Sequence, residues 1–282
     1  MFLEIIKFLI YSFLIVIIAK YVLVKLLRKL AENLNLKPKT VGNIAGFATS
    51  VPELLTISFS SATGFISTSI FNVLSSNVIN FIQYIFSIYI NKNAKVLKNT
   101  AIRIDIIMVL FTILIPVFLV WSNIETSIGI IPIFILLFLL CYMINNNTHK
   151  LYLKKEETKI EEEIIEEEKW IKGKRKITVA YSIYLILTGI LLFIIGNLLS
   201  NTLENLATLF NIPQSILGVV LGIITSIPEL ITFIESQKHY RNKNKTNSEL
   251  GVVEATNNLL TSNILNLFFI QSIGIFIYWI VT

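Results

Sequence analysis

Apolar runs long enough to cross a lipid bilayer recur along the whole sequence and constrain its fold more than any other feature. A helix needs about 20 apolar residues to cross roughly 30 Å of hydrocarbon. Because 54% of the 282 residues are hydrophobic, the runs leave no room for a soluble domain. We predict an all-α polytopic transmembrane bundle with about eight spans. The predicted spans are Leu3–Leu26, Thr40–Ala62, Phe65–Ile90, Ile102–Trp121, Ser127–Asn145, Ile177–Leu199, Pro213–Ser236 and Gly251–Val281.

Basic residues gather in alternate connectors between these spans, which indicates how the chain is inserted. The positive-inside rule places connectors rich in lysine and arginine in the cytoplasm. By this rule both termini lie outside, and we expect an integral, multi-pass protein of the plasma membrane. The net charge of +6 then reflects cytoplasmic loops near anionic lipid, and no nucleic-acid partner is expected. The basic residues after the first and third spans are Lys25, Arg28, Lys29, Lys37, Lys39, Lys92, Lys95, Lys98 and Arg103.

A charged connector divides the chain into two halves. Residues 150–176 mix glutamates with lysines, which is typical of a solvated helix or a flexible linker. A regulatory cation sensor is the alternative, but the connector lacks the Asp-Asn-Gly loop that folds around calcium. We predict a first transmembrane repeat over residues 1–146, a cytoplasmic linker over 147–176, and a shortened second transmembrane repeat over 177–282.

The two halves carry the same pair of motifs in the same order. Gly46–Leu54 matches Gly222–Leu230, and Asn72–Asn80 matches Asn258–Asn266. Two matched blocks indicate a duplication. The connector after the first glutamate-bearing span is predicted to lie outside and its counterpart inside, so the copies are inverted. Inverted repeats with broken helices are the architecture of many secondary transporters, whose ion sites lie where the repeats meet.

Side chains that carry oxygen share helix faces within these motifs. Thr49 and Glu53 are four residues apart, which places them on one face of a helix. The proline of each motif lacks an N–H and is predicted to free the carbonyl four residues earlier, at Ala48 and Ile224. A set of oxygen ligands suits hard cations such as calcium and sodium. The candidate ligands are Thr49, Ser50, Glu53, Ser76, Asn80, Thr225, Ser226, Glu229, Ser262 and Asn266.

Two carboxylates inside apolar spans need an explanation. A charge at the bilayer centre costs at least about 2.5–3.5 kcal/mol on insertion scales, so we expect Glu53 and Glu229 to be functional. The alternative is that the hydroxyls and amides only join helices, while each glutamate is protonated or reaches the membrane surface. Near the ends of spans, Asp105, Glu235 and Glu254 are predicted to be interfacial anchors.

At these residues the sequence resembles the calcium/cation antiporter superfamily, which includes the sodium/calcium exchangers. Its two alpha-repeats carry a Gly-Thr-Ser-x-Pro-Glu helix followed by a Gly-Ser-Asn-x-x-Asn/Asp helix. The resemblance covers Gly42–Asn80 and Gly218–Asn266. It implies that the ten candidate residues coordinate a cation, with Glu53 and Glu229 as the principal calcium ligands.

The sequence departs from the family pattern at small residues and in length. Ala48 and Ile224 stand where the family has glycine before Thr-Ser, and Ser75 and Thr261 stand where it has glycine before Ser-Asn. Such antiporters usually have ten spans, whereas this sequence stops after the helix that carries Asn266. We therefore expect the last two helices to be missing, through truncation, a partial gene product, or a divergent member that completes its scaffold as a homo-oligomer.

These features predict a secondary active antiporter that exchanges calcium for sodium or protons by alternating access. No enzyme activity and no cofactor are expected; the cations are transported ions. The alternative is a transport-inactive, divergent membrane protein with a structural or sensing role. An intramembrane hydrolase is not favoured, because the spans contain no Ser-His pair and no paired aspartates.

Overall fold

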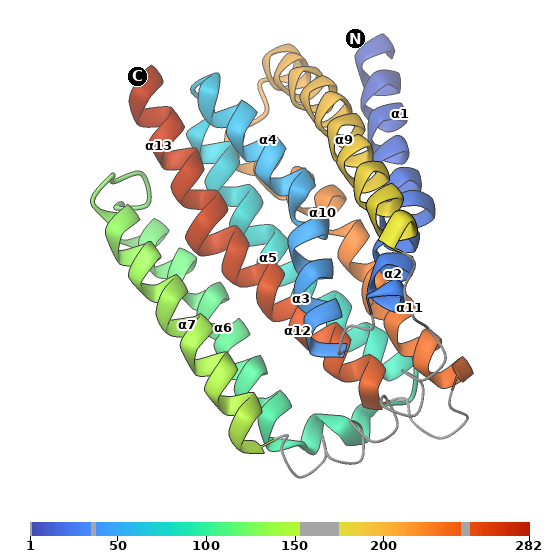
Figure 1. The fold of residues 1–282 in the computed structure, drawn as a ribbon. Coiled ribbons are helices and arrows are strands. Elements are labelled where there is room, and N and C mark those ends of the chain that lie inside the picture. The colour runs from blue at the N-terminus through green and yellow to red at the C-terminus, as the bar shows by residue number, and fades with distance from the viewer. Residues whose placement is uncertain (1, 35–37, 153–174, 244–248) are drawn as a thin grey trace.

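A computed structural model describes residues 2–34, 38–152, 175–243 and 249–282, and the regular elements within these ranges are all helices (Figure 1). The first half contains α1 (Phe2–Ile18), the π-helical turn η1 (Ala19–Leu23), α2 (Val24–Asn33), α3 (Pro38–Thr49), α4 (Val51–Ala62), α5 (Ile66–Ile90), the 3-10 turn η2 (Ala94–Lys98), α6 (Thr100–Trp121) and α7 (Ile130–Tyr152). The second half contains α9 (Arg175–Phe210), α10 (Gln214–Thr225), α11 (Ile227–Lys243), α12 (Glu249–Ile264), the π-helical turn η3 (Leu265–Ile270) and α13 (Gln271–Val281). The all-α prediction is confirmed.

Several helical segments are long and apolar enough to cross a membrane. The first two predicted spans correspond to α1 with α2 and to α3 with α4, each of which is interrupted. Within the described ranges, five segments meet both criteria, and the apolar stretch Ile130–Asn145 is shorter. The five segments are Ile66–Ile90, Thr100–Trp121, Val179–Phe210, Gln214–Tyr240 and Leu250–Val281.

Helix α9 continues well beyond the predicted end of its span at Leu199. It has 36 residues, which corresponds to about 54 Å at 1.5 Å per residue. The prediction ended early because Asn197, Ser200 and Asn201 lower the hydropathy there. The helix nevertheless continues, since neither glycine nor proline occurs between Gly196 and Pro213.

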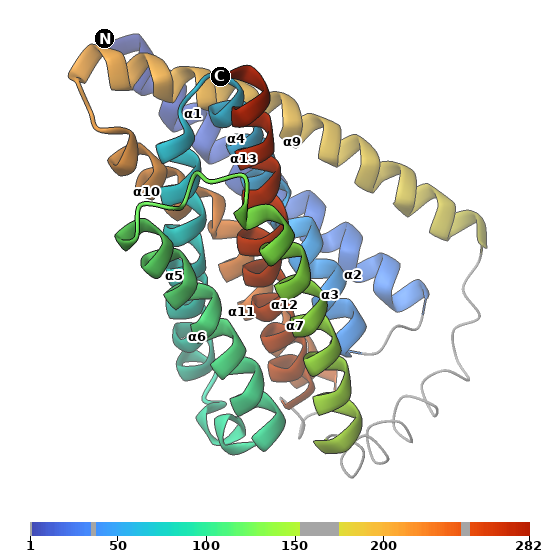
Figure 2. The ribbon, with the colours of Figure 1, turned by 90° about the vertical axis from the view of Figure 1, so that its left-hand side faces the viewer.

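The helices form a central group flanked on two sides. In Figure 1, α3, α4, α5, α10 and α12 lie in the middle, α6 and α7 on one side, and α1, α2 and α9 on the other. One apolar cluster joins α4, α5, α6, α7, α11 and α12, and another joins α1, α2, α9 and α10. Figure 2 shows α9 running obliquely across the bundle. Both termini lie at the same end, opposite the connector between α5 and α6 (Figure 1).

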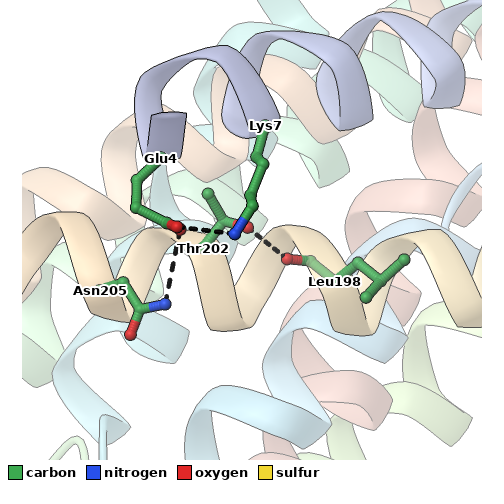
Figure 3. Close-up of polar contacts among 5 residues, drawn as sticks. All are labelled: Glu4, Lys7, Leu198, Thr202 and Asn205. Atoms are coloured by element: carbon green, nitrogen blue, oxygen red, sulfur yellow. Dashed lines mark hydrogen bonds and ion pairs between the residues drawn. The ribbon is translucent and has the colours of Figure 1, made fainter. Parts of the chain in front are cut away.

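One polar contact, between Asn205 and Glu4, joins α1 to the part of α9 that lies beyond the predicted span. Lys7 Nζ lies 2.7 Å from Glu4 Oε1, and Asn205 Nδ2 donates to Glu4 Oε2 at 3.5 Å (Figure 3). The Thr202 hydroxyl donates to the Leu198 carbonyl at 2.7 Å, within α9 itself. Leu203 and Ala207 in the extra turns of α9 also belong to the apolar cluster that contains Ile15 and Ile18 of α1.

Glycines bring each repeat into close contact with the other. A Cβ atom added at Gly42 would lie 2.3 Å from the Glu254 carbonyl oxygen, so α3 crosses α12 almost backbone to backbone. At the equivalent crossing of α10 and α5, a Cβ added at Gly218 would lie 2.4 Å from the Thr68 carbonyl oxygen. The same interlock is thus built twice, once from each repeat.

Two of the three predicted interfacial anchors are buried, so that prediction is wrong for them. Asp105 is 0% exposed and Glu254 is 4% exposed. Asp105 accepts a hydrogen bond from Asn145 Nδ2 at 3.1 Å, because α7 packs across the start of α6. Glu235 is exposed and lies 3.8 Å from Lys238 Nζ, as an anchor would. The sequence alone does not reveal which neighbouring helix covers an acid near the end of a span.

Candidate functional site

Both glutamate-bearing spans are broken one residue after the threonine of the motif. Helix α3 ends at Thr49 and α4 begins at Val51, while α10 ends at Thr225 and α11 begins at Ile227. The proline of each motif falls in the first turn of the new helix, where its missing N–H costs nothing. Glu53 and Glu229 therefore lie in the first turns of α4 and α11, where the helix dipole favours negative charge.

One backbone prediction at these breaks is wrong. The Ile224 carbonyl, expected to be free, accepts a backbone N–H at the end of α10. The chain closes the break with a tight turn around Ser226, so the carbonyl finds another donor. The side chains, not this carbonyl, are the candidates for binding an ion here.

The two carboxyl groups are sealed from solvent with few partners. Glu53 and Glu229 are both 0% exposed, and they lie close enough to interact electrostatically. Neither oxygen of Glu53 has a hydrogen-bond partner, and neither does Oε2 of Glu229. No ion pair joins either carboxylate to a basic residue in the described part of the chain. Two buried, unpaired and mutually repelling carboxylates are costly without a cation.

A chain of hydroxyl groups connects the repeats beside the carboxylates. The Ser50 hydroxyl donates to Ser262 Oγ at 3.0 Å, and the Ser262 hydroxyl donates to Glu229 Oε1 at 3.1 Å. Thr225 lies beside the Glu53 carboxyl group, and Thr49 lies beside that of Glu229. Each carboxylate is thus flanked by hydroxyl side chains from the other repeat.

Four asparagines form a symmetric clasp that the sequence did not reveal. Asn77 Nδ2 donates to the Asn263 carbonyl at 3.2 Å, and Asn263 Nδ2 donates to the Asn77 carbonyl at 3.1 Å. Asn80 Nδ2 then donates to Asn263 Oδ1 at 3.2 Å, and Asn266 Nδ2 donates to Asn77 Oδ1 at 3.3 Å. Asn77 and Asn263 occupy equivalent positions in the matched blocks, which was the available signal.

The clasp is also attached to α6 through a proline. Pro116 lies inside α6 and has no N–H for the carbonyl of Thr112. Asn77 Nδ2 donates to that carbonyl at 3.3 Å. Because the freed carbonyl takes an amide donor, α6 fixes the orientation of Asn77 and, through it, that of Asn266.

The clasp leaves an unequal number of donors and acceptors in the site. The amide nitrogens of Asn80 and Asn266 are engaged within the protein, the latter also with Ser76 Oγ at 3.5 Å. Their Oδ1 atoms are buried without a partner, like the free carboxylate oxygens. The site therefore presents oxygen atoms that lack donors, which is the arrangement that a hard cation completes.

All ten predicted ligands are buried in this region, with exposed fractions between 0% and 2%. Not every one has free capacity: the Thr49 and Thr225 hydroxyls donate to the Ala45 and Leu221 carbonyls at 2.9 and 3.0 Å, and the Ser226 hydroxyl has no partner. Among the described residues, no three His, Cys, Asp or Glu side chains gather into a metal cluster. The donor set is therefore hydroxyls and amides around two carboxylates.

Two of the four residues that replace family glycines, Ser75 and Thr261, are accommodated by hydrogen bonds. The Ser75 hydroxyl donates within α5 to the Phe71 carbonyl at 2.7 Å and lies 3.4 Å from the Gly218 carbonyl of α10. The Thr261 hydroxyl donates to Asn43 Oδ1 at 3.0 Å. The added atoms thus fill the crossings with polar contacts between the two repeats.

Comparison with known proteins agrees with this geometry. A family model described as sodium/calcium exchanger protein matches residues 5–145 and 180–282. A solved structure of the sodium-calcium exchanger NCX_Mj, soaked with 10 mM Na+ and zero Ca2+, is similar in fold with a TM-score of 0.56 and 18% sequence identity. The match covers 98% of this chain and 84% of that one. A comparison with curated proteins found no match.

Proposed function

The chain belongs to the sodium/calcium exchanger protein family, and we propose that it exchanges calcium for sodium by alternating access, with the ion held between its two repeats. Residues 1–146 and 177–282 are the two repeats in this proposal, and the connector over 147–176 is predicted to be cytoplasmic. Its first residues belong to α7 and its last to α9, and residues 153–174 lie outside the described part of the chain. No covalent chemistry and no cofactor are involved. The transported cations are the ligands of the site.

The observation that carries the proposal is the pair of buried carboxylates surrounded by acceptors without donors. Two negative charges balance one calcium ion, and unpaired oxygens from both repeats supply the rest of its coordination. A divalent ion also relieves the repulsion between Glu53 and Glu229 in a region of low dielectric constant. A purely structural pair would leave both costs uncompensated.

The asparagine clasp supports calcium selectivity over additional monovalent coupling. Some relatives carry Asp at one of the positions of Asn80 and Asn266, which the resemblance associates with potassium dependence. Here both side chains donate through Nδ2 to acceptors, which an aspartate is unable to do. We therefore propose no potassium requirement. Magnesium competes poorly because it dehydrates reluctantly and demands octahedral geometry.

Sodium is the proposed counter-ion, with protons as the alternative, because two neighbouring carboxyl groups can share protons. Alternating access uses the inverted repeats, whose symmetric crossings expose the site first to one side and then to the other. The termini face outward in this proposal, at the plasma membrane. This orientation is supported by Lys95 and Lys98, which lie in η2, in the connector opposite both termini (Figure 1).

Flux through the purified protein in lipid vesicles tests this function. An outward sodium gradient should drive calcium uptake into the vesicles, with potassium absent from both sides. Glu53→Gln and Glu229→Gln should each abolish uptake, while Ser58→Ala, on the same helix as Glu53, should not. Uptake driven equally well by a pH gradient without sodium would make protons the counter-ion. No calcium movement under either gradient would overturn the proposal and favour a structural or sensing role.

A further inference from the structure

Two asparagines outside the ten predicted ligands repeat the same unusual geometry in both halves. We propose that Asn72 and Asn258 are additional cation ligands, one on each side of the carboxylate pair, which bind the ion as it moves between the centre and the corresponding face. The inference rests on the proposed exchange function and adds a pair of sided binding positions to it.

The position of each asparagine continues a polar row along its helix. Asn72 precedes Ser76 by four residues on α5, and the Ser76 hydroxyl donates to the Asn72 carbonyl at 2.8 Å. Asn258 precedes Ser262 by four residues on α12, so the same face carries both side chains. Each row therefore extends from the candidate site toward one end of its helix.

The amide nitrogen of each asparagine is held beside a carboxylate-bearing helix. Asn72 Nδ2 donates to Thr56 Oγ1 at 2.9 Å, and the Thr56 hydroxyl lies 3.1 Å from the Glu53 carbonyl. In the other repeat Asn258 Nδ2 donates to Thr232 Oγ1, whose hydroxyl donates to the Glu229 carbonyl at 2.8 Å. The threonines thus fix both amides next to the turns that carry the glutamates.

The side-chain oxygen of each asparagine is buried and accepts no hydrogen bond. Asn72 and Asn258 are 0% and 2% exposed, and the Oδ1 atoms of both have no hydrogen-bond partner. A hydrogen bond that only joins two helices uses the N–H group of the amide and does not explain a buried acceptor without a donor. The same unpartnered Oδ1 atom at equivalent positions in both repeats indicates a ligand that arrives from outside the protein. A cation on the path to the carboxylates has the required chemistry.

Each asparagine also lies at one of the tight helix crossings. A Cβ added at Gly218 or Gly222 of α10 would lie 3.0 Å from the Asn72 nitrogen or 2.9 Å from its carbonyl oxygen. A Cβ added at Gly46 of α3 would lie 2.8 Å from the Asn258 carbonyl oxygen. The backbone of both asparagines is therefore held where the two repeats cross.

The two asparagines lie on opposite sides of the centre. Asn72 is in the first third of α5, which begins at Ile66 at the end of the bundle that carries both termini (Figure 1). Asn258 is in the first third of the continuous helix from α12 to α13, which begins at Glu249 at the opposite end. Asn72 should therefore affect ions from the side of the termini, and Asn258 ions from the other side.

Transport measured with calcium varied on one face at a time tests the proposal. Asn72→Leu should raise the calcium KM on the side of the termini by roughly ten- to hundredfold, as expected for losing one bond to a charged group, and leave the opposite KM within about twofold. Asn258→Leu should do the reverse. Asn72→Asp separates the two roles of the side chain, because it also loses the donor to Thr56 but retains an oxygen, and it should preserve the affinity.

Ser58→Ala is the matched control, since the Ser58 hydroxyl donates only to the Leu54 carbonyl of its own helix at 2.7 Å. Equal KM changes on both faces, or equal losses in Asn72→Leu and Asn72→Asp, would show a structural tie and overturn the inference while the exchange function stands. Unaltered KM values in the leucine variants would do the same. An unmodified protein that moves no cation would overturn both the exchange function and this inference.

Discussion

Glu53→Gln should stabilise the protein in the absence of cations while it removes calcium binding. Both oxygens of Glu53 lack hydrogen-bond partners, so the amide gives up no existing bond. The substitution removes one of two buried charges that repel each other, a penalty of roughly 2.5–3.5 kcal/mol on insertion scales. The new N–H groups also face a site rich in acceptors, where Glu229 Oε2 has no donor.

Thermal unfolding of the detergent-purified protein measures this effect. At roughly 2–4 °C per kcal/mol for a chain of this size, the unfolding temperature in a chelator should rise by roughly 5–14 °C. Calcium should raise the unfolding temperature of the unaltered protein by linkage, and should not raise that of the variant. Glu229→Gln is the partner variant, and it should gain less if the amide weakens the bond from Ser262. A lower unfolding temperature for Glu53→Gln without calcium, together with a preserved calcium response, would refute the reasoning.

Three further experiments test the helix crossings, the asparagine clasp and the orientation in the membrane. Gly218→Ala should lower the free energy of unfolding by roughly 1–3 kcal/mol and reduce flux, because its Cβ would meet the Thr68 backbone. The control Gly189→Ala, whose Cβ would have nothing within 4 Å, should leave the free energy of unfolding unchanged or raise it, as measured by denaturation. Asn77→Leu should cost about 3 kcal/mol or more and weaken calcium binding, since the Asn263 and Thr112 carbonyls lose the Asn77 donor and the Asn266 amide loses one of its two acceptors. Unchanged stability would contradict the clasp. In a Cys141→Ser background, a cysteine at Thr282 should be labelled only from outside and one at Lys95 only from the cytoplasm, and the reverse pattern would contradict the orientation.

The ten candidate ligands were predictable because their signal is local. Helix periodicity placed Thr49 and Glu53 on one face, and the second repeat doubled the evidence. That detail is wrong, because the break at Ser50 puts Thr49 in α3 and Glu53 in α4, and Thr49 lies beside the Glu229 carboxyl group. The asparagine clasp was not, because its bonds depend on the distance between helices of different repeats. The Ile224 carbonyl shows the same limit, since a turn after the proline motif, not the proline itself, decided its partner.

The span boundaries and the buried acids failed for tertiary reasons. Polar residues after Leu199 ended the predicted span, yet α9 continues because α1 packs against it. Asp105 and Glu254 have the sequence positions of interfacial anchors, but both are buried, Asp105 against α7 and Glu254 at the crossing of α3 and α12. The π-helical turn η3, which contains Asn266, has no counterpart in α5, and no residue pattern in the sequence predicted it.

Equilibrium calcium binding to the purified protein tests the central claim most directly. If one calcium ion is held between the repeats by Glu53 and Glu229, the unaltered protein should bind one calcium per chain, and sodium should displace it competitively without potassium. Glu53→Gln and Glu229→Gln should each abolish this binding in proteins that remain folded. Calcium binding that persists in both variants, or that sodium and protons both fail to displace, would contradict the account.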